Sequence, residues 1–573
     1  MENNNAVERI NGTIVRSKQL SFNPFYFCLL FMFIVFNSFV IGQTAPTKFW
    51  VQFTDKIGTP YSISNPSAFL SAKAIERRLK QNIAIAENDL PVNPSYVTGV
   101  VSQDSITLLH KSKWFNAITI QTTDTLAIQA IGNLSYVKNI SPVSIFKGIP
   151  EDQPIEANFK TTEEYSVGNY SYGSSYNQVN MIGTDCMHEK GYTGKGLLIA
   201  VLDAGFLLAN TNPCFDSLRA HNAIIGTWDF VTNDSMVYED DSHGTYVLST
   251  MGGHIPGQLV GTAPDATYLL LRTEDAPSEY IIEEDNWVAG AEYADSVGAD
   301  IINSSLGYTQ FDDASQNHVY ADLDGNTTRI TIGADIAASK GILVVNSAGN
   351  SGSSSWFYIG APADGDSVLA IGAVNANQQY ASFSSKGPSA DGRIKPNVAA
   401  KGQAATVTNF SNGISSANGT SFSSPIIAGA AASLWQANPN ATNMQIFKAI
   451  EQSATNYDNP DNLTGYGIPN FCIANELLHG KSREDFLENN ILTIHPNPFT
   501  TEINFIFYSD KEQSLTTNLY DARGRLINTT STACLSNRPY YQTIDNLFNL
   551  SEGIYILEVR TESFKEVYKL IKN

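Results

Sequence analysis

Short apolar runs recur along the middle of the chain, each bounded by polar or glycine-containing stretches. They are LLIAVL (197–202), ATYLLLRT (266–273), ADIINSSL (299–306), GILVVNS (341–347) and VLAIGAV (368–374). Continuous apolar runs of this length are typical of strands buried on both faces. Residues 284–298 and 330–340, between these runs, have helical periodicity. Residues 180–480 are therefore predicted to form an α/β domain with a parallel sheet covered by helices on both faces.

The pattern is different before this region. Residues 44–150 contain strand-like segments at 48–55, 116–123 and 137–146, and helix-like segments at 71–80 and 125–134, which together predict a small α+β unit. A stretch rich in Tyr, Ser, Asn and Gly follows at 151–179, and it is expected to be an extended, accessible linker or processing region.

The C-terminal part of the chain has no helical periodicity. After a short linker, KSREDFLENN (481–490), residues 491–573 contain many short strands separated by Asn, Gly and Ser. This spacing of strands and turns predicts a β-sandwich.

An apolar stretch near the N-terminus indicates export. Residues 25–42 are almost entirely apolar and follow a segment with Arg9, Arg16 and Lys18, while polar residues begin at Gln43. The apolar core is short for a membrane-spanning helix, so a cleaved signal peptide, residues 1–43, is favoured over a permanent anchor.

Composition narrows the class of protein. With 573 residues, two to four domains are expected. The net charge of −21 argues against nucleic acid or an anionic membrane as the main partner. The five cysteines show no zinc-ligand spacing, and one disulfide among Cys186, Cys214 and Cys472 is compatible with export, with the pairing left open.

Candidate chemistry begins at Ser421, in NGTSFSSPIIAGAAASLWQ (418–436). Gly419 and Pro425 place this serine at or next to the N-terminus of a helix, where free N–H groups favour a developing negative charge. Three further residues complete a set for acyl transfer. Asp203 ends a predicted strand, His243 lies in DSHGTYV, and Asn350 lies in a glycine-flanked turn.

Each of these residues also has an ordinary structural interpretation. Asp203 fits a helix cap, His243 a structural histidine, Asn350 a turn residue, and Ser421 a cap. A chain without this chemistry would rarely carry all four in this order with these flanks.

The motifs IAVLDAG, SHGTYV, INSSLG, SAGNSG and NGTSFSSP resemble those of subtilisin-family serine peptidases, in the family order. The resemblance implies a nucleophile at Ser421, a general base at His243, an orienting carboxylate at Asp203 and an oxyanion donor at Asn350. It also implies a substrate-binding strand, formed by Ser304, Ser305, Leu306 and Gly307.

Calcium binding is left open. The family's common calcium loop has no counterpart after the His243 helix, whereas residues 311–328 form a long loop that carries Asp322 and Asp324. These oxygens suit Ca²⁺, but DLDGN is also a good turn sequence, and the solvated turn is favoured. No cofactor is expected for the chemistry.

The regions on both sides of residues 180–480 also resemble known domains. Residues 44–150 are similar to the inhibitory propeptide of the family in position, size and element order. The tail, with PNP (496–498), YDARGR (520–525) and GIYILEV (553–559), resembles a sorting domain of type IX secretion. It implies transport to the outer membrane of a Gram-negative cell, followed by release or surface attachment. The alternative is a carbohydrate-binding or adhesive β-sandwich.

Together these features predict a secreted serine endopeptidase made as a zymogen, whose partners are protein or peptide substrates, its own propeptide and the type IX secretion machinery. The apolar residues at 355–363 predict a weak preference for aromatic or large aliphatic P1 side chains. One alternative is an inactive surface scaffold on the same fold. The other, an esterase or lipase, is disfavoured because its usual motif and residue order are absent.

Overall fold

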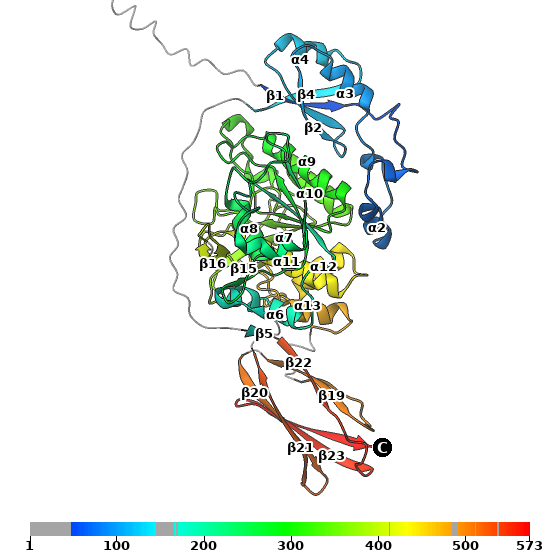
Figure 1. The fold of residues 1–573 in the computed structure, drawn as a ribbon, viewed down its shortest axis with the longest axis vertical. Coiled ribbons are helices and arrows are strands. Elements are labelled where there is room, and N and C mark those ends of the chain that lie inside the picture. The colour runs from blue at the N-terminus through cyan, green and yellow to red at the C-terminus, as the bar shows by residue number, and fades with distance from the viewer. Residues whose placement is uncertain are drawn as a thin grey trace, which may run out of the picture. The chain divides into compact units, whose positions relative to one another are not determined.

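The structure, a computed structural model, describes residues 47–144, 166–167, 170–411, 413–483, 491–509, 511–535 and 538–573 (Figure 1). Residues 46–573 form one compact unit. The predicted signal peptide, 1–43, and most of the predicted linkers at 151–179 and 481–490 lie outside the described residues. No helix among the described residues is both long enough and apolar enough to cross a membrane.

Seven parallel strands form the central sheet, in the order β15-β14-β13-β12-β7-β11-β8. In chain order they are β7 (Leu198–Asp203), β8 (Ile224–Asp229), β11 (Thr267–Arg272), β12 (Ile301–Ser304), β13 (Leu343–Ser347), β14 (Val368–Val374) and β15 (Val398–Lys401). The five apolar runs are thus confirmed as strands. The sequence analysis missed the two edge strands because β8 is mostly half-exposed and β15 has only 4 residues.

Helices cover both faces of this sheet, as predicted (Figure 1). On one face lie α8 (His243–Gly252), α11 (Thr420–Ala437), α12 (Asn443–Gln452) and α13 (Phe471–Leu478), and on the other α9 (Ile282–Val297) and α10 (Arg329–Ser339). Successive side chains of β7 alternate between the two cores. Ile199 and Val201 join the first, and Ala200 and Leu202 join the second.

The helix α11 is buried along nearly its whole length, and this explains its small side chains. All residues from Thr420 to Trp435 are buried. A Cβ atom added to Gly429 would lie 2.2 Å from Thr262 Oγ1, so no larger residue fits there. Ala and Gly therefore let α11 approach its neighbours closely.

An antiparallel sheet, β2-β3-β1-β4, forms the N-terminal α+β unit. Its strands are β1 (Lys48–Phe53), β2 (Thr107–Ser112), β3 (Ala117–Gln121) and β4 (Val137–Ser144), and its helices are α2 (Ala72–Lys80), α3 (Pro94–Val101) and α4 (Thr125–Gly132). The predicted strands and helices are confirmed, and α3 and β2 are additional.

Buried ion pairs join this unit to α9. The Asp295 carboxylate receives Arg77 Nη2 at 2.6 Å, Arg78 Nη2 at 2.8 Å and Lys113 Nζ at 2.9 Å. Burial raises the pKa of Asp295, but the three cations outweigh it and hold that pKa well below its usual range. These three cations offset the cost of burying the Asp295 carboxylate under the N-terminal unit.

One turn earlier on α9, Glu292 binds the same unit. Its carboxylate accepts from Ser112 Oγ at 2.6 Å and from the backbone N–H groups of Lys113 at 2.7 Å and Trp114 at 3.0 Å. The N-terminal unit is therefore docked through two acidic side chains of one helix.

The chain from Tyr170 onward belongs to the α/β domain, which corrects the expectation of an accessible linker up to residue 179. Short strands β5 (Ser166–Val167) and β6 (Tyr170–Ser171) precede α5 (Tyr176–Asn180). Tyr172 is fully buried, and its hydroxyl lies 2.8 Å from His188 Nδ1. Gln178 bonds both the N–H and the carbonyl of Thr406. Aromatic and amide side chains that look solvated in the sequence thus pack against the domain.

The C-terminal region is a β-sandwich, as predicted. Two antiparallel sheets, β18-β19-β22 and β21-β20-β23-β24, share one apolar core. Their strands are β18 (Ile491–His495), β19 (Ile503–Ser509), β20 (Gln513–Asp521), β21 (Leu526–Cys534), β22 (Arg538–Ile544), β23 (Gly553–Arg560) and β24 (Lys565–Lys572). Within YDARGR, the Asp521 carboxylate accepts the backbone N–H groups of Arg523 and Arg525, each at 3.0 Å, and so shapes the β20–β21 turn.

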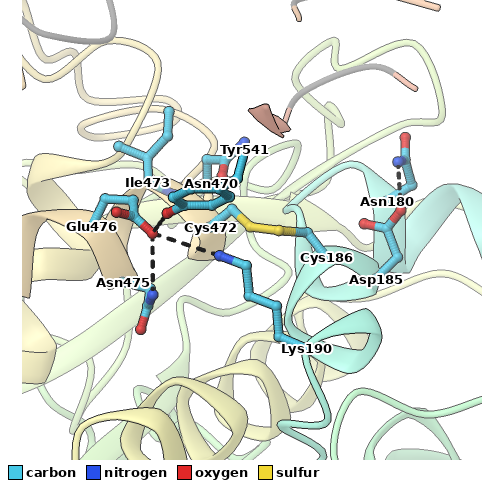
Figure 2. Close-up of a disulfide and its surroundings, with 10 residues drawn as sticks. All are labelled: Asn180, Asp185, Cys186, Lys190, Asn470, Cys472, Ile473, Asn475, Glu476 and Tyr541. Carbon is cyan, nitrogen blue, oxygen red and sulfur yellow. Dashed lines mark hydrogen bonds and ion pairs between the residues drawn. A yellow bond between two sulfur atoms is a disulfide. The ribbon is translucent and has the colours of Figure 1, made fainter. Parts of the chain in front are cut away.

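A disulfide joins Cys186, in α6 (Thr184–Glu189), to Cys472, in α13. Figure 2 shows it between the two helices, beside a contact in which Glu476 meets Lys190 Nζ at 3.5 Å and the hydroxyl of Tyr541. This selects one of the pairings that the sequence left open. The third candidate, Cys214, is a buried thiol whose pKa burial raises to about 12.

We expect this disulfide to contribute strongly to stability, because it closes a loop of 286 residues in the unfolded chain. The loop-entropy relation sets an upper value of about 5.6 kcal/mol. Replacing both Cys186 and Cys472 by Ser should lower the free energy of unfolding by up to this amount, measured by urea denaturation.

Reduction provides the matched control. Dithiothreitol should destabilise the parent protein and leave the Cys186→Ser/Cys472→Ser variant unchanged. Equal sensitivity of the two proteins would contradict the assignment.

Candidate active site

Asp203 lies at the carboxyl end of β7, in the centre of the sheet, and is fully buried. Its Oδ1 accepts from the backbone N–H of Ala204 at 2.9 Å and lies 2.7 Å from His243 Nδ1. A carboxylate held in this way keeps the imidazole proton on Nδ1 and leaves Nε2 as the basic nitrogen.

His243 is the first residue of α8, and its position depends on the next residue. A Cβ atom on Gly244 would lie 2.4 Å from the Gly205 carbonyl and 2.8 Å from the Phe206 ring, so only glycine lets the helix start so close to the loop after β7. The His243 backbone N–H donates to Asp241 Oδ1 at 2.6 Å. The glycine of SHG thus brings His243 against Asp203.

The charge of Asp203 controls the ionisation of His243. Burial lowers the pKa of His243, but the charge and hydrogen bond of Asp203, with smaller contributions from Glu274 and Asp241, raise it to about 9. The neutral imidazole, which is the form that can accept a proton, therefore prevails only at alkaline pH.

Ser421 is the second residue of α11, as the sequence predicts, and its Oγ donates to the Ser305 carbonyl at 3.3 Å. Pro425 lies in the second turn rather than the first, and it has no N–H for the carbonyl of Ser421, four residues earlier. Ser305 Oγ donates to that carbonyl instead, at 2.9 Å. Ser305 and Ser421 are thus joined by two hydrogen bonds, each from the hydroxyl of one residue to the carbonyl of the other, which link the start of α11 to the end of β12.

Asn350 is oriented by the same helix terminus. Its Oδ1 accepts from the backbone N–H of Thr420 at 2.9 Å and from Thr420 Oγ1 at 3.0 Å. Because the carbonyl side of the amide is held, the Nδ2 donor lies on the side of Gly419, 3.6 Å from where a Cβ of that residue would be.

These side chains border one cleft of about 600 Å³. His243, Ser421 and Asn350 line it together with Ser305, Leu306 and Gly307. Ser304, the first residue of the predicted substrate-binding strand, lies behind the wall instead. It is fully buried, and its Oγ accepts from Trp287 Nε1 at 2.9 Å.

Four acidic residues also line this cleft, and the sequence analysis did not select them: Asp240, Asp241, Glu274 and Glu279. The signal was present in YEDDSHG and RTEDAPSE, on either side of the β11 strand. It was missed because only the fold brings these two loops to the same side of His243.

The calcium candidates have other roles in the structure. Asp322 Oδ2 accepts the N–H of Val319, while the Asp324 carboxylate accepts the N–H of Asn326 and the hydroxyl of Thr327. Within the described part of the chain, no group of three His, Cys, Asp or Glu residues is placed to hold a metal ion. Hydrogen bonds of this kind, from nearby N–H and hydroxyl groups to a carboxylate, are those expected where DLDGN forms a turn.

Residues 194–467 match the subtilase family of S8 peptidases. Subtilisin E of Bacillus subtilis (strain 168) is 32% identical over 297 residues, which cover 51% of this chain and 69% of that protein. Subtilisin of Bacillus pumilus is 33% identical over 281 residues, which cover 48% of this chain and 90% of that protein. The chain belongs to the subtilase family.

Among solved structures, MycP1 from the ESX-1 type VII secretion system aligns with this subtilase at a TM-score of 0.42 and 24% identity. The alignment covers 57% of this chain and 93% of that one.

The flanks of this subtilase match two further families. Residues 48–158 match the S8 propeptide domain of Bacteroidota, and residues 493–573 match a secretion-system C-terminal sorting domain. The protein is therefore a subtilisin-family serine peptidase made as a zymogen, and its tail directs it to secretion or to the cell surface. The buried contacts of Asp295 and Glu292 described above are contacts between the propeptide and α9.

The link between Pro425 and Ser305 can be tested by a double-mutant cycle. In a Ser421→Ala background, Ser305→Ala should cost about 1 kcal/mol of stability, because the carbonyl of residue 421 loses its donor. Pro425→Ala supplies a helical N–H to that carbonyl, so the same Ser305→Ala change should cost much less in its presence. Urea denaturation of the four proteins gives the coupling energy between the two substitutions. If their effects on the free energy of unfolding simply add, the Ser305 hydroxyl does not replace the N–H that Pro425 lacks.

The pKa of His243 predicts an alkaline pH profile for this subtilase. Since the neutral imidazole is the base, kcat/KM should rise with pH and reach half its maximum near pH 9. Asp203→Asn removes the main raising charge, so the profile should move to lower pH while the maximal rate falls steeply. A half-maximum near pH 6.5 for the parent enzyme would show that Asp203 does not control His243.

Proposed function

We propose that this subtilase is a secreted endopeptidase that hydrolyses peptide bonds through an acyl-enzyme on Ser421. The observation that carries the proposal is the 2.7 Å contact between Asp203 and His243 at a cleft that Ser421 also lines. An ordinary structural histidine would not need a fully buried carboxylate behind it and an open cleft in front of it.

In the proposed reaction, the Ser421 hydroxyl turns from the Ser305 carbonyl towards His243 when substrate enters. His243 Nε2 takes the hydroxyl proton as Oγ attacks the peptide carbonyl, and the imidazolium is stabilised by Asp203. The same proton passes to the departing amine as the C–N bond breaks. Water, activated by the neutral His243, then hydrolyses the ester and regenerates Ser421.

The negative charge of the tetrahedral intermediate is placed at the start of α11. The donors proposed for the oxyanion are Asn350 Nδ2 and the backbone N–H of Ser421, and the helix dipole adds to both. Because Thr420 holds the amide before substrate arrives, this arrangement needs little reorganisation during the reaction.

Substrate is proposed to bind as an added strand along Ser305, Leu306 and Gly307, which line the cleft. Backbone pairing of this kind accepts many sequences and leaves selectivity to side-chain pockets. A weak preference for aromatic or large aliphatic P1 residues remains part of the proposal.

The inactive-scaffold alternative is not favoured, because Asp203, His243, Asn350 and Ser421 are all present and the last three line one cleft. The esterase alternative would need a different serine motif and residue order. For export we propose an N-terminal signal peptide, followed by recognition of the tail by the type IX secretion machinery at the outer membrane of a Gram-negative cell.

The decisive experiment compares the secreted protein with its Ser421→Ala variant in cleavage of an unfolded protein, with and without an active-site serine reagent. Wild type should cleave, the reagent should stop it, and the variant should be inert while folded. The expected loss is about 10⁶ in kcat, the value known for subtilisin, a relative. Equal inertness of both proteins after removal of the propeptide would support the scaffold alternative.

A second variant separates the two roles of Asn350. Asn350→Asp keeps an oxygen for Thr420 but has no N–H to offer the oxyanion. Its kcat should fall by about 10²–10³, the range known for loss of this donor in subtilisin, with little change in stability. The matched control is Thr420→Ala, which removes the hydroxyl that holds the amide and should lower kcat less.

A further inference from the structure

One side of the cleft carries a row of carboxylates, Asp240, Asp241, Glu274 and Glu279, which we call the acidic wall. Two of its members have partners within the protein. Asp240 receives Arg272 Nη1 at 3.0 Å, and Asp241 caps the N–H of His243. The side chains of Glu274 and Glu279 are different, because among the described residues neither has a cationic partner in a salt bridge.

Glu274 lies next to the substrate-binding strand. Its Oε2 accepts from the hydroxyl of Tyr308 at 3.4 Å, and Tyr308 directly follows Gly307. The direction from Ser305, beside Ser421, to Tyr308 leads away from the nucleophile. Substrate residues paired with this strand, as proposed above, would therefore pass Glu274 on one side of the scissile bond.

A third glutamate interacts electrostatically with Glu274 and Glu279. Glu283 is only 1% exposed, and neither of its carboxylate oxygens has a hydrogen-bond partner within 3.5 Å. Burial raises its pKa, and the charges of Glu279, Glu274 and Asp275 raise it further. A buried carboxylate surrounded by others is costly, so it takes up a proton or needs a cation beside it.

The propeptide brings a cation to this region. Lys48, at the start of β1, interacts electrostatically with Asp275 and Glu283, and its Cα partner in the sheet is Ser144, the last residue of β4. When the propeptide leaves, this positive charge leaves with it.

We propose that Glu274 and Glu279 bind the ammonium or guanidinium group of a substrate lysine or arginine that lies beside His243. The mature enzyme then selects peptides with a basic residue within a few positions of the cleaved bond. The proposal rests on the proposed function and names its substrate class. It concerns a subsite other than P1.

The physical gain has two sources. Charge-assisted hydrogen bonds form between the cation and the two carboxylates, and the repulsion between Glu274, Glu279 and Glu283 is relieved. A neutral side chain at the same position would leave the carboxylates unpaired. Hydrogen bonds to charged groups are large enough to make the expected preference about 10- to 100-fold in kcat/KM.

The test uses mature enzyme released from the secreted full-length zymogen, with internally quenched peptides of one parent sequence. Lys, Arg, Gln, Met or Glu is placed in turn at each of the four positions on either side of the scissile bond. We expect Lys and Arg to exceed Gln and Met by about 10- to 100-fold at one position other than P1, and Glu to be the poorest there. This preference should weaken between 0.05 and 0.5 M salt, about a twofold or greater loss, because screening acts on the ion pair.

The variant Glu274→Gln/Glu279→Gln should lower the Lys:Gln ratio to near 1, while Gln peptides are still cleaved. Comparing two peptides within each enzyme removes any effect of the substitutions on the ionisation of His243. The matched control is Asp216→Asn, a 72% exposed carboxylate of a helix that does not line the cleft, and it should keep the full ratio.

Each result decides the proposal. If wild type cleaves the Gln and Lys peptides equally well at every position, the proposal is overturned while the peptidase function stands. An unchanged ratio in the double variant would likewise overturn it. If the double variant does not fold, the wild-type profile and its salt dependence decide alone. Loss of all Ser421-dependent cleavage would instead refute the proposed function.

Discussion

The active site depends on the close packing of α11 against the sheet. The helix is buried from Thr420 to Trp435, and only Ala, Gly and Ser allow such an approach along most of that length. Its N-terminus therefore reaches the carboxyl ends of the strands, where Ser305, Asn350 and Asp203 already lie. A single constraint on side-chain size thus places the nucleophile, its helix dipole and the oxyanion donor together.

Some acidic side chains of this peptidase have charged or hydrogen-bonding partners, and others do not. Asp295 and Glu292 are fully engaged by the propeptide, through arginines, a lysine and backbone N–H groups. Release of the propeptide exposes both carboxylates to water, and their hydration then replaces the lost ion pairs and hydrogen bonds. Within the described residues, Glu274 and Glu279 of the acidic wall have no salt-bridge partner, and we propose that substrate supplies one.

The same charges act on the catalytic base. Asp203, Asp241 and Glu274 all raise the pKa of His243, and Glu274 is itself part of the acidic wall. Binding of a cation there would offset part of this effect and make the imidazole easier to deprotonate. Substrate recognition and base strength are thus coupled through one carboxylate.

Export imposes a further requirement, which the disulfide meets. Cys186 and Cys472 join α6 to α13 near the two ends of the α/β domain, in a compartment where thiols oxidise. The contact of Glu476 with Tyr541 brings the tail to the same place (Figure 2). The helix that follows the catalytic core therefore carries both the covalent closure and the first contact with the sorting domain.

Local patterns in the sequence determined the architecture of this protein. Strands such as β7 and β14 are buried on both faces and so appear as continuous apolar runs, and the motifs around Asp203, His243 and Ser421 specify their own turns through adjacent glycines. These features depend on neighbours within a few residues, so they can be read without the fold.

Tertiary structure alone decided the contacts between distant segments. The pairing of Cys186 with Cys472, the burial of Tyr172 and the binding of Asp295 by Arg77 join residues that no local pattern relates. The acidic wall is of the same kind, since Asp241 and Glu274 lie in loops that follow different strands. Burial and charge pairing depend on where chain segments meet in space, and hydrophobic periodicity carries no information on that.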